Sequence, residues 1–145
     1  MEAEFDRADL VRTALEARGR AYTPYSHYTV GAALLTAEGD IYQGGNIENA
    51  SYGATNCAER TAIFKAVSEG RRRFRAIAIA GGMEGQEPVD YAYPCGICRQ
   101  VMKEFAGEDF RIIVAKSAAD YKVYTLEELL HHGFGGNSIQ RISRL

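Results

Sequence analysis

The sequence predicts an α/β fold in which helices cover a β-sheet. Three segments carry apolar residues at the spacing of one helical face, and short runs rich in β-branched and small apolar residues lie between and after them. After a first helix, the expected order is strand, strand, helix, strand, helix, strand, strand. Strands that alternate with helices in this way form a sheet with helices packed against it.

A helix and a hairpin form the N-terminal part of this prediction. Residues 5–18 have the pattern of an amphipathic helix, and Gly19 follows as a stop signal. Residues 28–35 are expected to form the first strand and residues 41–45 the second. The turn TAEGD between them contains Gly39, which adopts a positive φ angle at little cost. The two strands are therefore expected to pair as a hairpin.

The middle of the chain contains a second helix, expected over residues 57–69, with Gly70 at its end. The polar loop NIENASYGAT precedes this helix. Residues 74–80 are largely apolar, which suits a buried strand. A loop that contains several glycines is expected over residues 81–93.

The C-terminal part begins with a third helix over residues 94–106, because Pro94 suits the first helical position. Residues 111–115 and 121–124 are expected to form two further strands. The segment TLEELL predicts a short helix with a capping box that starts at Thr125.

The length of 145 residues suggests one domain spanning residues 1–145, and the net charge of -2 argues against a strongly basic nucleic-acid-binding protein. The acidic N-terminus lacks the apolar stretch of a signal peptide, and no apolar run approaches the roughly 20 residues of a membrane span. We therefore expect a cytoplasmic protein without membrane contacts. The run RRRFR at residues 71–75 is compatible with nucleic-acid binding, but such runs more often form solvated helix ends.

Three cysteines, Cys57, Cys95 and Cys98, lie at the starts of predicted helices. Cytosolic thiols are usually reduced, and a helix N-terminus favours the thiolate form. The segment PCGIC places Cys95 and Cys98 on one helical face. Three thiolates from two helix starts supply three corners of a tetrahedral zinc site, and the lack of a fourth cysteine leaves one position open, as in catalytic zinc sites.

Two other interpretations of the cysteines stay open at this point. A single C-x-x-C is compatible with a redox pair, although such a pair does not require a third cysteine at another helix start. A structural zinc site with three cysteines and one histidine would need His27, His131 or His132. None of these lies close to a cysteine in the sequence, although the fold can still bring one near.

Glu59 lies two residues after Cys57. It fits an ordinary role in the first turn of a helix, either with the helix dipole or in a capping box that starts at Asn56. Zinc deaminases, however, have a cysteine or histidine two residues before a glutamate that carries protons, followed by P-C-x-x-C. The segments CAE and PCGIC fit the all-cysteine form of this pattern.

Longer segments resemble the small, homotetrameric class of cytidine deaminases, from about Tyr22 to Phe134. These segments are YTPYSHYTVGAAL, GGNIENASYGATNCAERTA and YPCGICRQVMKEF. The resemblance implies a three-layer α/β/α fold with a five-stranded mixed sheet. It also implies zinc-dependent, hydrolytic deamination of cytidine and deoxycytidine in pyrimidine salvage.

The resemblance also assigns roles to individual residues. Cys57, Cys95 and Cys98 match the zinc ligands. Glu59 matches the glutamate that transfers protons, and Arg60 matches an arginine that hydrogen-bonds the thiolates. The positions that match substrate contacts are Tyr28, Asn46, Glu48, Tyr52, Ala58 and Phe134.

The implied substrate contacts come from more than one subunit. Asn46 and Glu48 match a pair that binds the ribose hydroxyl, for which an amide and a carboxylate offer donors and acceptors. Ala58 lies where main-chain groups meet the pyrimidine. Phe134 matches an aromatic residue that stacks on the base, and Tyr52 matches a tyrosine that reaches a neighbouring subunit's site. The implied active unit is a homotetramer with shared sites.

Three positions depart from the family pattern. Tyr28 stands where phenylalanine is usual, Tyr93 stands where serine is common, and His131 stands where proline is frequent. These differences affect substrate contacts and leave the zinc ligands unchanged.

Three other functions compete with this interpretation. An enzyme of the same fold can deaminate an antibiotic nucleoside such as blasticidin S, but the segment NIEN argues for a plain nucleoside. A deaminase acting on polynucleotides conflicts with the net charge of -2. A structural zinc module leaves Glu59 without a role.

Overall fold

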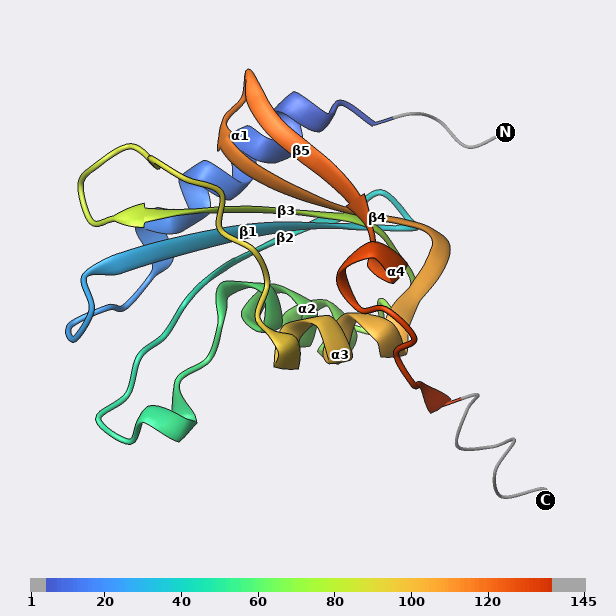
Figure 1. Ribbon diagram of the computed structural model, residues 1–145. Helices are drawn as coiled ribbons and strands as arrows, with labels where there is room; N and C mark the ends of the chain where they lie inside the picture. Colours follow the sequence, from blue (N-terminus) through green and yellow to red (C-terminus); the bar gives the residue numbers. More distant parts are fainter. Residues whose placement is uncertain (1–4, 137–145) are drawn as a thin grey trace.

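The computed structural model describes residues 5–136, which form a five-stranded sheet between helices (Figure 1). The strands are β1 (Tyr28–Thr36), β2 (Ile41–Gly45), β3 (Phe74–Met83), β4 (Ala106–Ser117) and β5 (Asp120–Thr125). The α-helices are α1 (Arg7–Ala17), α2 (Ala58–Ser68), α3 (Gly96–Phe105) and α4 (Leu126–Leu129), and two short 3₁₀ helices cover Arg18–Arg20 and Tyr52–Ala54. Among the helices of this range, none has the length and apolar character needed to cross a membrane.

The sheet is mixed, with the strand order β2-β1-β3-β4-β5. β1 pairs antiparallel with both β2 and β3, β3 pairs parallel with β4, and β4 pairs antiparallel with β5. A parallel pair needs a crossover connection, and α3 lies in the one that joins β3 to β4. Because β1 and β3 are antiparallel, Tyr28 at the start of β1 pairs with Met83 at the end of β3. These two ends lie on the side of the sheet from which the chain continues to α3.

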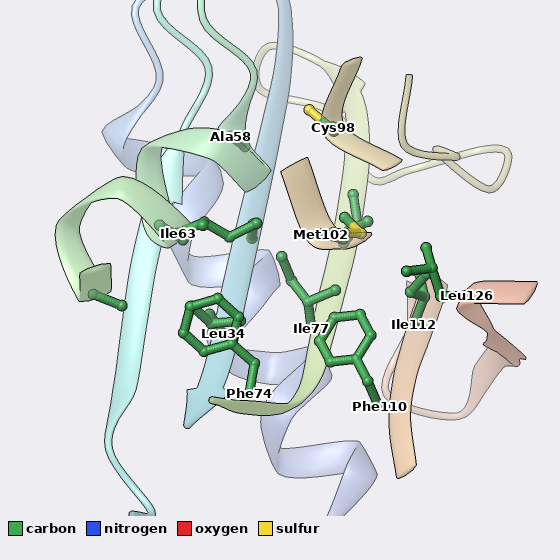
Figure 2. Packing of buried hydrophobic residues seen from close by; sticks show 14 of the residues in the cluster. Leu34, Ala58, Ile63, Phe74, Ile77, Cys98, Met102, Phe110, Ile112 and Leu126 are labelled. Carbon is green, nitrogen blue, oxygen red and sulfur yellow. The ribbon is translucent and has the colours of Figure 1, made fainter. Parts of the chain in front are cut away.

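The helices form layers on opposite faces of this sheet (Figure 1). Alternate residues of the central strands face opposite sides, as the period of a strand requires. Ile77 and Ile112 belong to the larger apolar cluster together with residues of α2 and α3 (Figure 2). Ile79 belongs to the same cluster. Ala76, Ala78 and Ile113 belong to a second cluster with residues of α1. The expected three-layer arrangement with a five-stranded mixed sheet is therefore confirmed.

The boundaries of several elements differ from those expected. α3 begins at Gly96 and Cys95 is its N-cap residue, so Pro94 precedes the helix and is not its first residue. β3 continues to Met83, whereas the sequence predicts a loop from residue 81. β4 begins at Ala106 because its backbone pairs with Phe74, and this pairing does not require apolar side chains.

Helix α2 lies so close to β2 that only glycine fits between them. A Cβ atom at Gly44 would lie 2.4 Å from the carbonyl oxygen of Ala58 and 2.6 Å from the backbone nitrogen of Ala62. Both contacts are with backbone atoms, so a side chain cannot be accommodated by a change of rotamer. Because Ala58 follows Cys57, this close approach fixes the helix start that carries Cys57 relative to the sheet.

We expect Gly44→Ala to lower the free energy of unfolding by about 1–3 kcal/mol, because the added methyl group overlaps the backbone of α2. Urea denaturation monitored by circular dichroism measures this change. Gly53→Ala is the matched control, since a Cβ atom at Gly53 meets nothing within 4 Å. The control should change stability by less than about 0.5 kcal/mol. Equal effects of the two substitutions would contradict the close-packing argument.

Candidate active site

Two helix N-termini bring the three cysteines together. Cys57 is the N-cap residue of α2, Cys95 is the N-cap residue of α3, and Cys98 lies in the first turn of α3. Their Sγ atoms all lie within 4.8 Å of one another, and those of Cys57 and Cys95 are 3.7 Å apart. All three are free cysteines. The fold thus assembles the group that the sequence singled out.

The spacing of the sulfur atoms suits zinc. Tetrahedral zinc with Zn–S bonds of about 2.3 Å places two coordinated sulfur atoms about 3.8 Å apart. The separation of 3.7 Å between the Cys57 and Cys95 sulfur atoms matches this value. Within residues 5–136 this is the only group of three or more histidine, cysteine or acidic side chains arranged to hold a metal ion, and it includes no histidine. The site therefore fits a zinc ion with three protein ligands and one open position.

Hydrogen bonds to the sulfur atoms stabilise negative charge. Arg60 donates from Nη2 to Cys57 Sγ at 3.4 Å, and the backbone N–H of Cys98 donates to Cys95 Sγ at 3.5 Å. Hydrogen bonds from the Cys98 thiol and from Arg60 lower the pKa of Cys57. The thiolate is the form that binds metals. Because three thiolates overcompensate the charge of Zn²⁺, donors such as Arg60 are needed to draw off the excess.

Glu59 is a buried carboxylic acid beside these sulfur atoms. Only 4% of its surface is exposed, and this burial raises its pKa to about 7. The capping box that could have explained Glu59 is not formed, since Cys57 and not Asn56 is the N-cap residue of α2. The Asn56 side chain instead donates to Thr61 Oγ1 at 3.1 Å. An acid that is buried next to a metal site and has no capping role is a candidate for proton transfer.

A cavity of about 360 Å³ opens beside the cysteines and Glu59. Of the expected site residues, those that line it are Tyr28, Asn46, Cys57, Ala58, Glu59 and Cys95. The remaining lining residues are Val30, Thr55, Asn56, Ile79, Ala92 and Tyr93. A larger hollow of about 560 Å³ lies near Phe5 and Tyr121, which pack against the cluster under α1 on the other face of the sheet. The donor set, and not the size, therefore identifies the functional cavity.

Asn46 and Glu48, the expected ribose contacts, both bind backbone groups near the start of β1. Asn46 Oδ1 accepts from the N–H of Val30 at 2.9 Å, and its Nδ2 donates to the carbonyl oxygen of Tyr28 at 3.0 Å. Glu48 Oε1 accepts from the N–H groups of residues 25 and 26 at 3.0 and 3.1 Å. Asn46 also lines the cavity, whereas Glu48 does not. Asn46 thus holds the start of β1, which carries Tyr28, and Glu48 holds the turn that precedes it.

Tyr52 and Phe134 lie outside the cavity of this chain. Tyr52 is 78% exposed and packs edge-on against Tyr25, with ring centroids 6.1 Å apart. Phe134 is 59% exposed, and its carbonyl oxygen accepts a hydrogen bond from Gln100 Nε2 at 3.0 Å. Neither ring lines the cavity of its own chain.

Sequence reasoning missed the residues that hold the loop before Cys95. The Tyr93 hydroxyl lies 2.8 Å from that of Tyr124 on β5, and the Tyr91 hydroxyl donates to Asp120. Arg99 binds the carbonyl oxygen of the residue that precedes Cys95. The partners of these side chains are distant in sequence or are backbone atoms, so no local pattern could have revealed them.

A three-layer α/β fold that groups three thiols beside a cavity lined by a buried carboxylic acid has the features of a zinc-dependent deaminase. Residues 6–115 match the sequence profile of a family described as the cytidine and deoxycytidylate deaminase zinc-binding region. This match covers more than half of the chain, so the protein belongs to that family of enzymes, and zinc is its metal.

Comparisons with individual proteins agree with this assignment. The chain is 49% identical over 129 residues to the cytidine deaminase of Halalkalibacterium halodurans. These aligned residues make up 89% of this chain and 94% of that relative. The crystal structure of cytidine deaminase from Burkholderia pseudomallei is similar with a TM-score of 0.81 and 42% identity, over 90% of this chain and 100% of that one. The blasticidin-S deaminase of Bacillus cereus is less similar, at 32% identity over 125 residues, which cover 84% of this chain and 87% of that protein.

We expect purified protein to contain one zinc ion per chain, and Arg60→Ala to bind it more weakly, because the substitution removes a donor to Cys57 Sγ. Losses of such supporting groups typically reduce metal affinity or activity about 10–100-fold. Competition with a chromogenic chelator measures the affinity, and Arg72→Ala, at an exposed position, is the control. If the two variants retain zinc and activity equally, the charge-compensation argument is wrong.

Proposed function

We propose that the protein is a cytidine deaminase that hydrolyses cytidine and deoxycytidine to uridine and deoxyuridine with release of ammonia. The observation that carries this proposal is the buried Glu59, which lines a cavity together with Cys57 and Cys95, two members of the group of three cysteines. The names of the most similar relatives support cytidine as the base. We further propose that the 145 residues act as one domain in cytoplasmic pyrimidine salvage.

The reaction replaces the amino group at C4 of cytosine with oxygen from water. Cys57, Cys95 and Cys98 would hold the zinc ion, which would supply a hydroxide nucleophile near neutral pH by lowering the pKa of water. Glu59, as a carboxylate, accepts the proton of the water and delivers it to N3 of the base. Glu59 then takes the proton of the new hydroxyl group at C4 and passes it to the amino group, so that the C4–N bond breaks, a C4=O bond forms and ammonia leaves. Burial of Glu59 keeps bulk water from competing for this proton.

The other residues of the cavity are proposed to bind the nucleoside. Asn46 and Glu48 are assigned to the ribose hydroxyl, and Ala58, as the first residue of α2, is assigned to main-chain contacts with the pyrimidine. In this proposal a substrate hydroxyl joins the hydrogen bonds that Asn46 and Glu48 already make near Tyr28. Tyr28 forms part of the wall against the base.

We expect Glu59→Gln to retain zinc and the fold but to lower the turnover of cytidine by about 10²- to 10⁴-fold or more, because the amide cannot accept the proton. Ammonia release should be measured with cytidine, deoxycytidine, CMP and blasticidin S, together with zinc content. The native protein should act on the first two. Dominant activity on blasticidin S would replace the proposed substrate, and near-normal turnover by Glu59→Gln with zinc bound would remove Glu59 from the mechanism.

We also propose that the active unit is a homotetramer with sites shared between subunits. Tyr52 and Phe134 expose large aromatic surfaces and do not line the cavity of their own chain. In this proposal they complete the cavity of a neighbouring chain, and Phe134 stacks on the base there. A closed symmetric assembly would form several such sites at once.

Shared sites can be tested by mixing inactive and impaired chains. Phe134→Ala should raise KM roughly tenfold, since stacking on an aromatic ring contributes about 1–3 kcal/mol per base. Glu59→Gln and Phe134→Ala chains are dissociated, mixed and reassembled. Some sites then combine Glu59 of one chain with Phe134 of another, so activity at low cytidine concentration should exceed the sum of the parents. Mixing without dissociation is the control, and strict additivity after reassembly, or an active monomer in light scattering, would contradict the proposal.

A further inference from the structure

Two consecutive side chains of α3 bind segments that lie far apart in the sequence. The Arg99 guanidinium donates from Nε to the carbonyl oxygen of Pro94 at 2.7 Å and from Nη1 to that of Leu129 at 2.6 Å. Gln100 Nε2 donates to the carbonyl oxygen of Phe134 at 3.0 Å. The helix that carries two of the metal ligands therefore also holds the C-terminal segment.

The bond to Pro94 acts on the loop that leads to the metal site. Pro94 is fully buried and immediately precedes Cys95, the N-cap residue of α3. Its carbonyl group belongs to the peptide unit that joins Pro94 to Cys95, so fixing this group limits the rotation of that unit. Arg99 therefore helps to determine where the Cys95 sulfur atom lies relative to that of Cys57.

The bond to Leu129 acts on the segment that leads to Phe134. Leu129 is the last residue of α4, where backbone carbonyl groups lack partners within the helix. Leu130 packs against the larger apolar cluster, and Gly133 donates its N–H to the carbonyl oxygen of Leu130 at 3.2 Å. Arg99 and Gln100 thus hold the two ends of the segment 129–134.

We propose that Arg99 is a positioning residue that joins the loop before Cys95 to the segment carrying Phe134, so that zinc retention and the placement of Phe134 depend on one side chain. Arginine suits this role because its planar guanidinium directs donors toward two acceptors at fixed angles. A lysine ammonium at the same place has no such fork. Hydrogen bonds from a charged donor are also stronger than those between neutral groups.

This connection must work in both directions, because coupling between two sites is reciprocal at equilibrium. If the loop before Cys95 and the segment 129–134 are joined through Arg99, then bound zinc must also stabilise that segment. Removal of zinc should therefore increase the opening of residues 129–134 in the native chain. In Arg99→Met the same segment should be open whether or not zinc is bound.

The test compares zinc-loaded native protein with Arg99→Met, Arg99→Lys and Gln100→Met, and uses Arg72→Met at an exposed position as the control. Zinc release to a chromogenic chelator should be at least about tenfold faster for Arg99→Met, in line with other groups that support metal ligands. The rate of zinc release by Arg99→Lys should lie between those of the native protein and Arg99→Met, because a lysine ammonium can bind only one of the two carbonyl groups at a time. Arg72→Met should release zinc at the native rate, whereas Gln100→Met, which keeps the bond from Arg99 to Pro94, should release it faster than the native protein but more slowly than Arg99→Met.

Hydrogen exchange measured by mass spectrometry provides the second readout. Exchange of 129–134 should be faster in Arg99→Met and in Gln100→Met, while that of β3 should not change. KM for cytidine should rise in Arg99→Met and in Gln100→Met. This measurement is the only part of the test that rests on the proposed function. Zinc release and exchange do not depend on the substrate, so they test Arg99 even if the natural substrate is another nucleoside.

Three results would overturn the proposal. The first is equal zinc release by Arg99→Met and Arg72→Met. The second is exchange of 129–134 in the native chain that does not respond to zinc removal. The third is faster exchange throughout the molecule, including β3, which would show that Arg99 contributes general stability and not a connection between two segments.

Discussion

The N-termini of α2 and α3 must meet at one end of the sheet, and the active site depends on this contact. Gly44 allows the backbone of α2 to lie against β2, and the parallel pairing of β3 with β4 places α3 in a crossover on the same face of the sheet. Each helix then contributes its N-cap cysteine, with the two sulfur atoms 3.7 Å apart. A shift of either helix by one residue would separate these sulfur atoms.

This contact concentrates negative charge in a small volume. The three cysteine sulfur atoms lie together, Cys57 and Cys95 line the same cavity as Glu59, and the Arg60 guanidinium donates directly to the sulfur atom of Cys57. The backbone N–H groups at the helix starts also stabilise negative charge on the sulfur atoms, as the hydrogen bond from Cys98 N–H to Cys95 Sγ illustrates. The metal, the arginine and the helix termini must therefore be considered as one electrostatic unit.

The sequence was most informative where function or backbone conformation depends on a short local pattern. Gly39 has the expected positive φ angle, Thr125 forms the expected capping box, and the cysteines converge as their positions at helix starts indicated. Contacts between distant backbone groups could not be predicted. The first residues of β4 are held by pairing with Phe74, and Arg99 binds carbonyl groups that any residue would present. The resemblance named Glu48, but only the structure shows that its carboxylate also holds the turn before β1.

The proximity of Cys57 and Cys95 also makes the protein sensitive to oxidants. Cys95 is exposed, and a thiolate adjacent to a second thiol is the arrangement from which disulfides form. In the metal-free chain a disulfide between these residues would remove two of the proposed zinc ligands at once, and a reductant would be needed before zinc could return. Bound zinc therefore protects the thiols, so that metal occupancy determines how long the protein remains usable in an oxidising environment as well as whether it is active.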